Sequence, residues 1–428
     1  MAARRQLPPS RRLRILLTDG SGLTSRQVAT IASDAGHEVE VLSPDPMALT
    51  RFTRTVRHVH RVPPYWDDPI RWLDAALEVA AGRRVDVLFP TQEQVAALAA
   101  ADDRVRSAGI RTVVPPWEGL VQVQDKLSAH ATLSALGLPQ PPSTVARTAA
   151  ELGAVTGLPA FVKLPIGTAS RGVARVGNAA ELARVALEWD AAGCFDDGGV
   201  VVQEPVDGPL AMVQSVFAHG VLVAFHATLR VREGASGGAS HKRSVDLAVM
   251  AGHLSALGSA LAWHGALSMD VMLDDRGPWV IDVNPRLVEP VNAWRSGVDL
   301  VAPMLELALD GSPPVQAPGR PGVATHQGLL AVLGAAAGRR PRRAVLHELG
   351  GMLTHNGDYR GSTEELTPPA HDWRTLAPVV IAATSVLVHP GSWRRFSSSA
   401  SSNYALSPEG WRQLIAVRSA RGGDTPVH

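Results

Sequence analysis

Lysine is scarce in this chain. Lys126, Lys163 and Lys242 are the only three among 41 basic residues, and the other 38 are arginine. An ammonium is a compact charge on a flexible stem, whereas a guanidinium is a rigid planar fork. A chain that otherwise uses arginine therefore has a physical reason to keep lysine where it meets a small oxyanion. Chance in an arginine-rich composition explains any one lysine equally well.

Cysteine, net charge and long apolar runs are also scarce. The single cysteine, Cys194, excludes an intramolecular disulfide framework and a cysteine-rich zinc site, which predicts a cytoplasmic location. The longest apolar run, residues 376–388, is shorter than the roughly 20 residues of a bilayer span and predicts a buried helix. A net charge of +1 gives no general attraction to nucleic acid or membranes, so we expect neither as a partner.

Length and patterning predict several domains. At 428 residues the chain is too long for one compact core. Residues 1–12 are basic, lack a signal-peptide pattern and predict a flexible tail. After them, short apolar runs alternate with helical patterns, which predicts a parallel, doubly wound α/β sheet. The expected strands are residues 13–18, 37–43, 85–90 and 110–115, with helices over 25–35, 74–81 and 92–100.

Two turns of this first segment have alternative interpretations. The turn of residues 19–22 after the first strand suits either a dinucleotide phosphate or a plain tight turn. Ser25 stands where the dinucleotide fingerprint has its third glycine, which favours the tight turn. Thr91 and Glu93 follow a strand where open sheets place ligand contacts, but a helix cap and a first-turn acid explain them as well.

A strand that ends near Lys163 leads into a loop with glycines at both ends, residues 167–172. Such a loop is flexible and rich in backbone and hydroxyl donors, so it suits a polyphosphate. A hairpin with one exposed lysine is the alternative. Further on, residues 233–243 are rich in glycine and serine and end in His-Lys-Arg, which predicts either a mobile catalytic lid or a solvated loop.

The most specific segment is the hairpin of residues 267–286. Its two strands bring Asp270 close to Asp282, and Asn284 lies two residues further along the same face. Two carboxylates and an amide oxygen form the kind of site that Mg²⁺ prefers when it is shared with phosphates. Arg286 then presents a guanidinium beside that site. Glu289, Asn292 and Arg295 follow closely, where they are either substrate contacts or part of an ordinary helix start.

These motifs resemble the ATP-grasp superfamily. Lys126 in QDKLSAHATLSALGLPQPPS, Lys163 in FVKLPIGTASRGV, the segment VVQEPVDG and the hairpin SMDVMLDDRGPWVIDVNPR occur in that superfamily's order and approximate spacing. Over residues 13–314 the chain resembles the carboxylate–amine ligase and carbamoyl-phosphate-synthase-like branch. The resemblance implies an α/β fold with a Rossmann-like N-terminal domain, a two-lobed α+β ATP-grasp domain and a C-terminal extension that caps the site or forms a dimer. The implied bounds are residues 13–116, 117–316 with a small lobe at about 135–205, and 317–428.

The resemblance also implies residue roles. Phosphate, flap and adenine contacts fall to Lys126, Lys163, Gly167, Thr168, Ser170, Arg171, Gly172, Gln203, Glu204 and Val206. Leu210 replaces the family's usual glutamate, so the ribose contact shifts to Asp207. One or two Mg²⁺, with Mn²⁺ as an alternative, are implied on Asp270, Asp282 and Asn284. Arg286 stabilises the transferred phosphoryl group, and the lid reading adds Lys242 and Arg243 as catalytic residues.

The implied activity is ligation of a carboxylate to an amine, an amino acid or small peptide, through an acyl-phosphate, with ATP giving ADP and phosphate. A homodimer with small-molecule substrates is the implied form. Two other classes stay open. One is an ATP-grasp carboxylase or kinase-like enzyme, and the other is a nucleotide-binding regulator without turnover. The identities of the carboxylate and amine are not encoded in these motifs.

Overall fold

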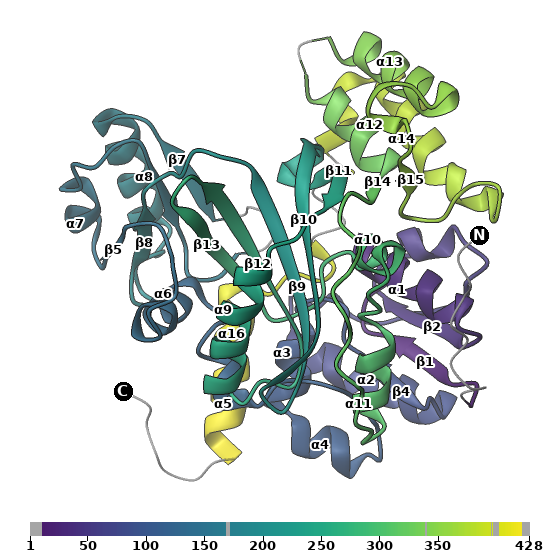
Figure 1. The fold of residues 1–428 in the computed structure, drawn as a ribbon. Helices are drawn as coiled ribbons and strands as arrows, with labels where there is room; N and C mark the ends of the chain where they lie inside the picture. Colours follow the sequence, from purple (N-terminus) through teal and green to yellow (C-terminus); the bar gives the residue numbers. More distant parts are fainter. Residues whose placement is uncertain (1–10, 168–171, 339, 395, 397–401, 422–428) are drawn as a thin grey trace.

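The computed structural model describes residues 11–167, 172–338, 340–394, 396 and 402–421. The architecture is mixed α/β, with three sheets and helices around them (Figure 1). Thr168, Ser170 and Arg171, which the sequence assigns to the phosphate loop, lie outside the described residues. Within the described ranges, no helix is long and apolar enough to cross a membrane.

The N-terminal sheet is parallel, as the alternating pattern predicts. Its strand order is β3-β2-β1-β4, with β1 at Arg14–Leu17, β2 at Glu38–Ser43, β3 at Val56–Arg61 and β4 at Val87–Phe89. The helices are α1 (Leu23–Asp34), α2 (Pro69–Arg83), α3 (Val95–Ala100) and α4 (Asp102–Ser107). Asp68 caps α2 by accepting hydrogen bonds from the Ile70 and Arg71 amides, and Pro69 fills the first helical position, where no amide partner is needed.

One strand expected for this sheet is absent, and one observed strand was not expected. Residues 110–115 form no strand, because their pairing to β4 is limited to one bond from the Leu88 amide to the Arg111 carbonyl. The observed fourth strand is β3 at the edge of the sheet, whose sequence VRHVHR has two valines among four arginine and histidine residues. Its exposure explains why it lacks the continuous apolar run that marks a buried parallel strand.

The second sheet is antiparallel, with the order β5-β8-β6-β7. Its strands are β5 (Ser143–Ala146), β6 (Ala160–Lys163), β7 (Val173–Val176) and β8 (Val200–Gln203). Helices α7 (Ala149–Gly153) and α8 (Ala179–Ala191) pack against each other beside it and share its small apolar core. Figure 1 shows this lobe at the left of the molecule.

The third sheet has seven strands in the order β13-β12-β9-β10-β11-β14-β15. The strands are β9 (Leu210–Ala218), β10 (Val221–Glu233), β11 (Ala239–Ser244), β12 (Gly265–Asp274), β13 (Gly277–Asn284), β14 (Ala324–His326) and β15 (Thr363–Glu364). The interpretation of residues 233–243 as an unstructured loop is wrong. Residues 235–237 form one 3-10 turn between β10 and β11, and β11 is buried except at Arg243.

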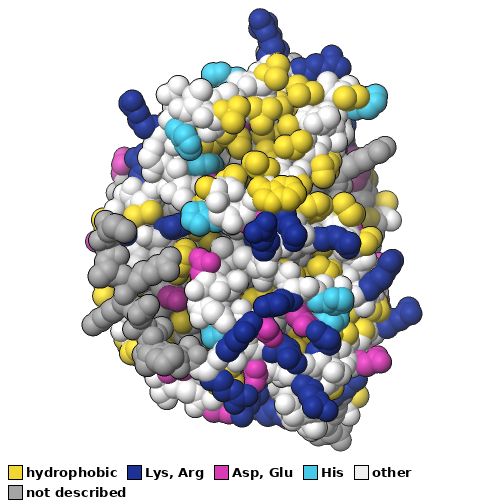
Figure 2. All heavy atoms as spheres, turned by 90° about the vertical axis from the view of Figure 1, so that its right-hand side faces the viewer, with side chains coloured by type: hydrophobic (Ala, Val, Ile, Leu, Met, Phe, Trp, Pro, Cys, Tyr) yellow, Lys and Arg dark blue, Asp and Glu magenta, His cyan; other side chains and the backbone are white. Residues whose placement is uncertain are grey.

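The C-terminal residues join this sheet and continue as helices. Strands β14 and β15 extend its edge, and α12 (Gly328–Ala336), α13 (Pro341–Thr354) and α14 (Leu376–Val388) pack together above it. Residues 376–388 are helical as expected but not fully buried, since Val380 is 57% exposed. The upper part of Figure 2, over these helices, gathers hydrophobic side chains at the surface. The last helix, α16 (Pro408–Arg421), returns to pack on α2 and α3.

Candidate active site

A cavity of about 880 Å³ is lined by residues of the second and third sheets, of α1 and the loops beside the N-terminal sheet, and of the C-terminal helices. Its volume lies in the range of roughly 300–1,000 Å³ that is usual for small-molecule sites. Lys126, Lys163, Gly167, Gln203, Glu204, Val206, Asp270, Asp282, Asn284 and Arg286 all line it. The structure thus brings together most of the residues that the sequence motifs single out.

Lys163 lies at the end of β6, where it bridges two sheets. Its Nζ donates to Gln203 Oε1 on β8 and to the carbonyl oxygen of Ile281 on β13, each at 2.7 Å. Burial lowers the pKa of Lys163 to about 8, although the nearby carboxylate of Asp282 opposes that shift. The Lys163 ammonium is partly removed from water at this position. It therefore favours an anionic ligand, because the ligand's negative charge replaces the lost interaction with water.

Lys126 opens helix α6 (Lys126–Ala135), which is capped by Asp125 through the Ser128 amide at 2.8 Å. Its Nζ donates to the Gly167 carbonyl at 3.2 Å and lies 3.8 Å from Asp282 Oδ1. The cap therefore fixes the first turn of α6. From this turn the Lys126 ammonium reaches both Gly167 and the carboxylate of Asp282.

Asp270 and Asp282 lie close together on β12 and β13, as the hairpin pattern predicts, and a register shift between Val271 and Asp270 pairs them directly. Burial, followed by the charge of Asp282, raises the pKa of Asp270 to about 7. Asn284 lies two residues after Asp282 and pairs with Ser268. Two like charges held this close in a buried cavity are costly without a counter-charge, and their oxygen donors match those that Mg²⁺ takes.

The donor set fits a divalent cation that is also bound by another ligand. Two aspartates and one asparagine supply fewer oxygens than Mg²⁺ requires, and phosphate oxygens or water usually complete such a site. Consistent with this composition, the described residues contain no group of three or more His, Cys, Asp or Glu side chains placed to hold a metal ion by themselves.

Arg286 forms a buried ion pair that the sequence does not reveal. Its Nε donates to Glu93 Oε1 at 3.0 Å, and the two side chains are 11% and 7% exposed. Its Nη2 lies 3.4 Å from Asn284 Oδ1. Glu93 therefore holds the guanidinium beside Asn284, a role different from the ligand contact or first-turn acid considered for it. The only sequence signal was its place after a strand of the N-terminal sheet.

The remaining predicted nucleotide contacts divide into two groups. Glu204, Val206 and Leu210 line the cavity beside Gln203, and the Glu204 amide is fixed by a 2.9 Å bond to the Pro142 carbonyl. Asp207 is exposed and lies outside the cavity lining, so its proposed ribose contact gains no support from its position. Gly172, after the segment predicted to bind phosphate, has a φ of +77°, a conformation that favours glycine.

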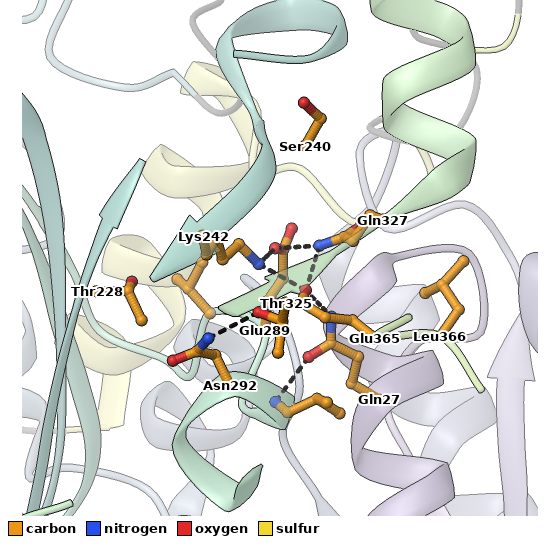
Figure 3. Close-up of polar contacts among 12 residues, drawn as sticks. Gln27, Thr228, Ser240, Lys242, Glu289, Asn292, Thr325, Gln327, Glu365 and Leu366 are labelled. Carbon is orange, nitrogen blue, oxygen red and sulfur yellow. Dashed lines mark hydrogen bonds and ion pairs between the residues drawn. The ribbon is translucent and has the colours of Figure 1, made fainter. Parts of the chain in front are cut away.

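Lys242 is buried, which contradicts the lid. Figure 3 shows its side chain reaching from β11 toward Glu289, Glu365 and Gln327. Its Nζ forms ion pairs with Glu289 and, at 2.7 Å, with Glu365 Oε2. Burial alone would lower the pKa of Lys242, but the two carboxylates raise it above its usual value. Arg243 faces the opposite way, is exposed and does not line the cavity.

Glu365 is the most enclosed member of this cluster. Besides Lys242 it accepts hydrogen bonds from Gln27 at 2.9 Å, Gln327 at 2.7 Å and Thr325 at 2.6 Å. These donors come from α1, β14 and the residue that follows β14, so the cluster ties the N-terminal sheet and the C-terminal residues to the large sheet. Such a fully bonded carboxylate is what a buried charge requires.

Glu289 differs from Glu365 because it also lines the cavity. Its backbone has a φ of +53°, which is uncommon outside glycine and marks a position held by its surroundings. Burial and the nearby Glu365 raise its pKa. Asn292, another of the predicted substrate contacts, is instead fully buried and bonded to Thr325 and His226, as expected of a structural residue.

No family model matches the chain. Among curated proteins, the sequence is 31% identical over 195 residues to y4rH of Sinorhizobium fredii. That relative is described as an uncharacterized protein. The alignment covers 40% of this chain, and the chain spans 38% of the length of that relative.

Solved structures show a wider likeness. The biotin carboxylase domain of Hydrogenobacter thermophilus 2-oxoglutarate carboxylase, in complex with MgADP, ADP and bicarbonate, matches with a TM-score of 0.58 and 16% identity, over 73% of this chain and 74% of that one. The L-amino acid ligase from Bacillus licheniformis matches with a TM-score of 0.54 and 16% identity, over 71% and 76%. At these identities the likeness establishes a shared fold.

Proposed function

Since the chain has the ATP-grasp fold, we propose that it is an ATP- and Mg²⁺-dependent ligase that joins a carboxylate to an amine through an acyl-phosphate. The observation that carries the proposal is the pairing of Asp270 with Asp282 beside Lys126 and Lys163 at one end of the cavity. In this proposal residues 13–116 form a Rossmann-like domain, residues 117–316 the two-lobed ATP-grasp domain, and residues 317–428 a cap.

Each residue has a physical role in the proposed reaction. Lys126 and Lys163 bind the phosphates of ATP, while Gln203, Glu204 and Val206 contact the adenine. Asp270, Asp282 and Asn284 hold one or two Mg²⁺, which neutralise charge on the phosphates when bound. Arg286, oriented by Glu93, stabilises the phosphoryl group as it moves to the substrate carboxylate. Displacement of phosphate by the amine then forms the amide.

Positioning and electrostatics are sufficient for this chemistry, because phosphoryl transfer needs no protein nucleophile. The neighbour structures support the cofactors, since one of them is described in complex with MgADP. They also include both carboxylases and an amino acid ligase, so the fold alone does not decide between the two reactions. A homodimer remains part of the proposal.

The test is a phosphate-release screen with ATP, Mg²⁺ and pairs of amino acids or small peptides, with product masses measured. The proposal predicts release that needs both a carboxylate and an amine, with a product lighter than the summed substrates by one water. Bicarbonate-dependent release that needs no amine would support the carboxylase class instead. Release that needs neither a carboxylate nor bicarbonate would contradict both.

A further inference from the structure

The cavity has an apolar arm that the proposed ATP and metal contacts do not use. Helices α12 and α14 and the segment after them contribute its wall, which consists of Leu329, Leu330, Leu333, Pro378, Ile381 and Phe396. The turn between β10 and β11 closes it from the sheet side with Ala235, Gly237, Gly238 and Ala239. All of the helical wall lies beyond residue 314, where the resemblance to the superfamily ends.

The arm starts next to Glu289. Gln327 donates to Glu289 Oε2 and immediately precedes α12, so Leu329 and Leu330 of its first turn lie close to that carboxylate. Leu330 also packs against the β10–β11 turn. If Gly234 of this turn carried a side chain, its β-carbon would lie only 3.0 Å from the carbonyl oxygen of Leu330. Glu289 thus stands between the metal end of the cavity and its apolar arm.

Around Glu289 the carboxylates outnumber the cations, so a further cation can bind there. Lys242 is shared by two carboxylates, Glu289 and Glu365. Within the described residues, the two hydrogen bonds recorded to the Glu289 side chain both end on Oε2. The other oxygen belongs to a side chain that is 13% exposed and lines the cavity. An ammonium there would supply the second positive charge of the cluster, and charge-assisted bonds of this kind are strong.

We propose that the carboxylate substrate is an α-amino acid with a large apolar side chain. Its carboxylate lies toward Arg286 and the metal end, its ammonium meets Glu289, and its side chain fills the apolar arm. This inference rests on the proposed function for the fate of the carboxylate, but the recognition itself concerns binding alone. It also gives residues 317–428 a role, as the region that selects the substrate side chain.

The test is calorimetric binding of leucine, phenylalanine and alanine to the full-length protein, without ATP. Each buried methylene tightens binding by about fourfold, so leucine should bind at least roughly 10-fold more tightly than alanine. The analogue 4-methylpentanoate, which is leucine without its ammonium, should bind more weakly than leucine. Equal affinity for leucine and alanine, or for leucine and the analogue, would overturn the proposal.

A matched pair of variants locates the arm. Ile381 lines the cavity and is 43% exposed, whereas Val380, the preceding residue of α14, is 57% exposed and does not line it. I381D should weaken leucine binding about 10-fold and leave alanine binding within about twofold, while V380D should change neither. Unchanged leucine affinity in I381D would place the side chain elsewhere.

Failure of the two proposals can be told apart. If leucine binds and I381D weakens it, but no amine supports amide formation, the substrate inference stands and the ligase function falls. If amide products form only from polar amino acids, the ligase function stands and the apolar arm is not the substrate site. The E289Q variant adds a check, because it should weaken binding of leucine and leave binding of 4-methylpentanoate unchanged.

Discussion

Lys242 forms a 2.7 Å ion pair with Glu365, a residue 123 positions later in the chain. Glu365 follows the last strand of the large sheet, and Lys242 lies on an inner strand. The pair therefore joins the C-terminal residues to the body of the protein. It also fixes the position of Glu289, which shares the same ammonium and faces the cavity.

Replacing Lys242 with methionine should destabilise the protein by about 3–5 kcal/mol, because two buried carboxylates would lose their shared counter-charge. Urea unfolding followed by circular dichroism measures this change. R243A is the control, since Arg243 is exposed on the same strand and should change the free energy of unfolding by less than about 0.5 kcal/mol. A K242M protein that is as stable as the wild type but inactive would instead assign Lys242 a direct catalytic role.

Replacing Asp282 with alanine should lower ATP-dependent phosphate release by roughly 10²-fold or more, since a metal ligand opposite Asp270 is lost. The far-ultraviolet circular dichroism spectrum should stay unchanged, because Asp282 is a partly exposed side chain at the cavity. D275A, in the exposed turn of the same hairpin, is the matched control and should keep full activity. Turnover like that of the wild type in D282A would remove the hairpin from the site.

The part of the site that lies within one hairpin could be predicted from sequence. Asp270 and Asp282 are 12 positions apart on two strands joined by a short turn, so the hairpin alone brings them close. A register shift between Val271 and Asp270 then sets the two aspartates directly opposite each other, and alternation from the turn does not predict that shift. The partnership of Arg286 with Glu93 could not be predicted, because it joins residues 193 positions apart. It depends on how the N-terminal sheet packs against the large one, and neither local sequence records that packing.

The interpretation of residues 233–243 as a mobile lid is wrong for a related reason. Glycine and serine in residues 233–243 predict mobility when the segment is taken alone, but here the glycines allow a tight turn against α12. The buried face of β11 is polar, with Ser240 bonded to the Arg232 carbonyl on β10 and Lys242 bonded to the distant Glu365, so it lacks the apolar alternation of an ordinary strand. Tertiary contacts made by residues 289, 327 and 365 stabilise it.

Replacing Glu93 with glutamine should lower kcat by about 10- to 100-fold, because Arg286 loses the carboxylate that orients it. The KM for ATP should change by less than about threefold, since Lys126 and Lys163 are untouched. Steady-state kinetics with E93D should show partial rescue. E118Q, at an exposed residue of α5 (Trp117–Leu120), is the control. A rise in KM alone would mean that Glu93 contacts the substrate directly.

Acid should destabilise the folded protein through its buried histidines. Burial lowers the pKa of His226 to about 4, although its hydrogen bond to Asn292 and the charge of Glu365 oppose that shift and Lys242 adds to it. In the unfolded chain a histidine takes up its proton near pH 6.5, so folding loses stability as the pH falls from about 6.5 to about 4.

The expected loss from His226 between pH 7 and pH 5 is roughly 2 kcal/mol in the free energy of unfolding. Urea unfolding at both pH values should show a smaller pH effect in H226Q than in the wild type. H58Q, at an exposed position of β3, should keep the wild-type difference. An identical pH effect in H226Q and the wild type would show that His226 is not the group responsible.

In the proposed reaction, the substrate carboxylate attacks the γ-phosphate of ATP. This step is tested most directly with a carboxylate substrate labelled with ¹⁸O on both oxygens, in the pair that supports phosphate release. Mass spectrometry of the released inorganic phosphate should then find one ¹⁸O atom in each molecule, because the acyl-phosphate passes one carboxylate oxygen to phosphate when the amine attacks. Unlabelled phosphate in every turnover would contradict an acyl-phosphate intermediate and with it the proposed reaction.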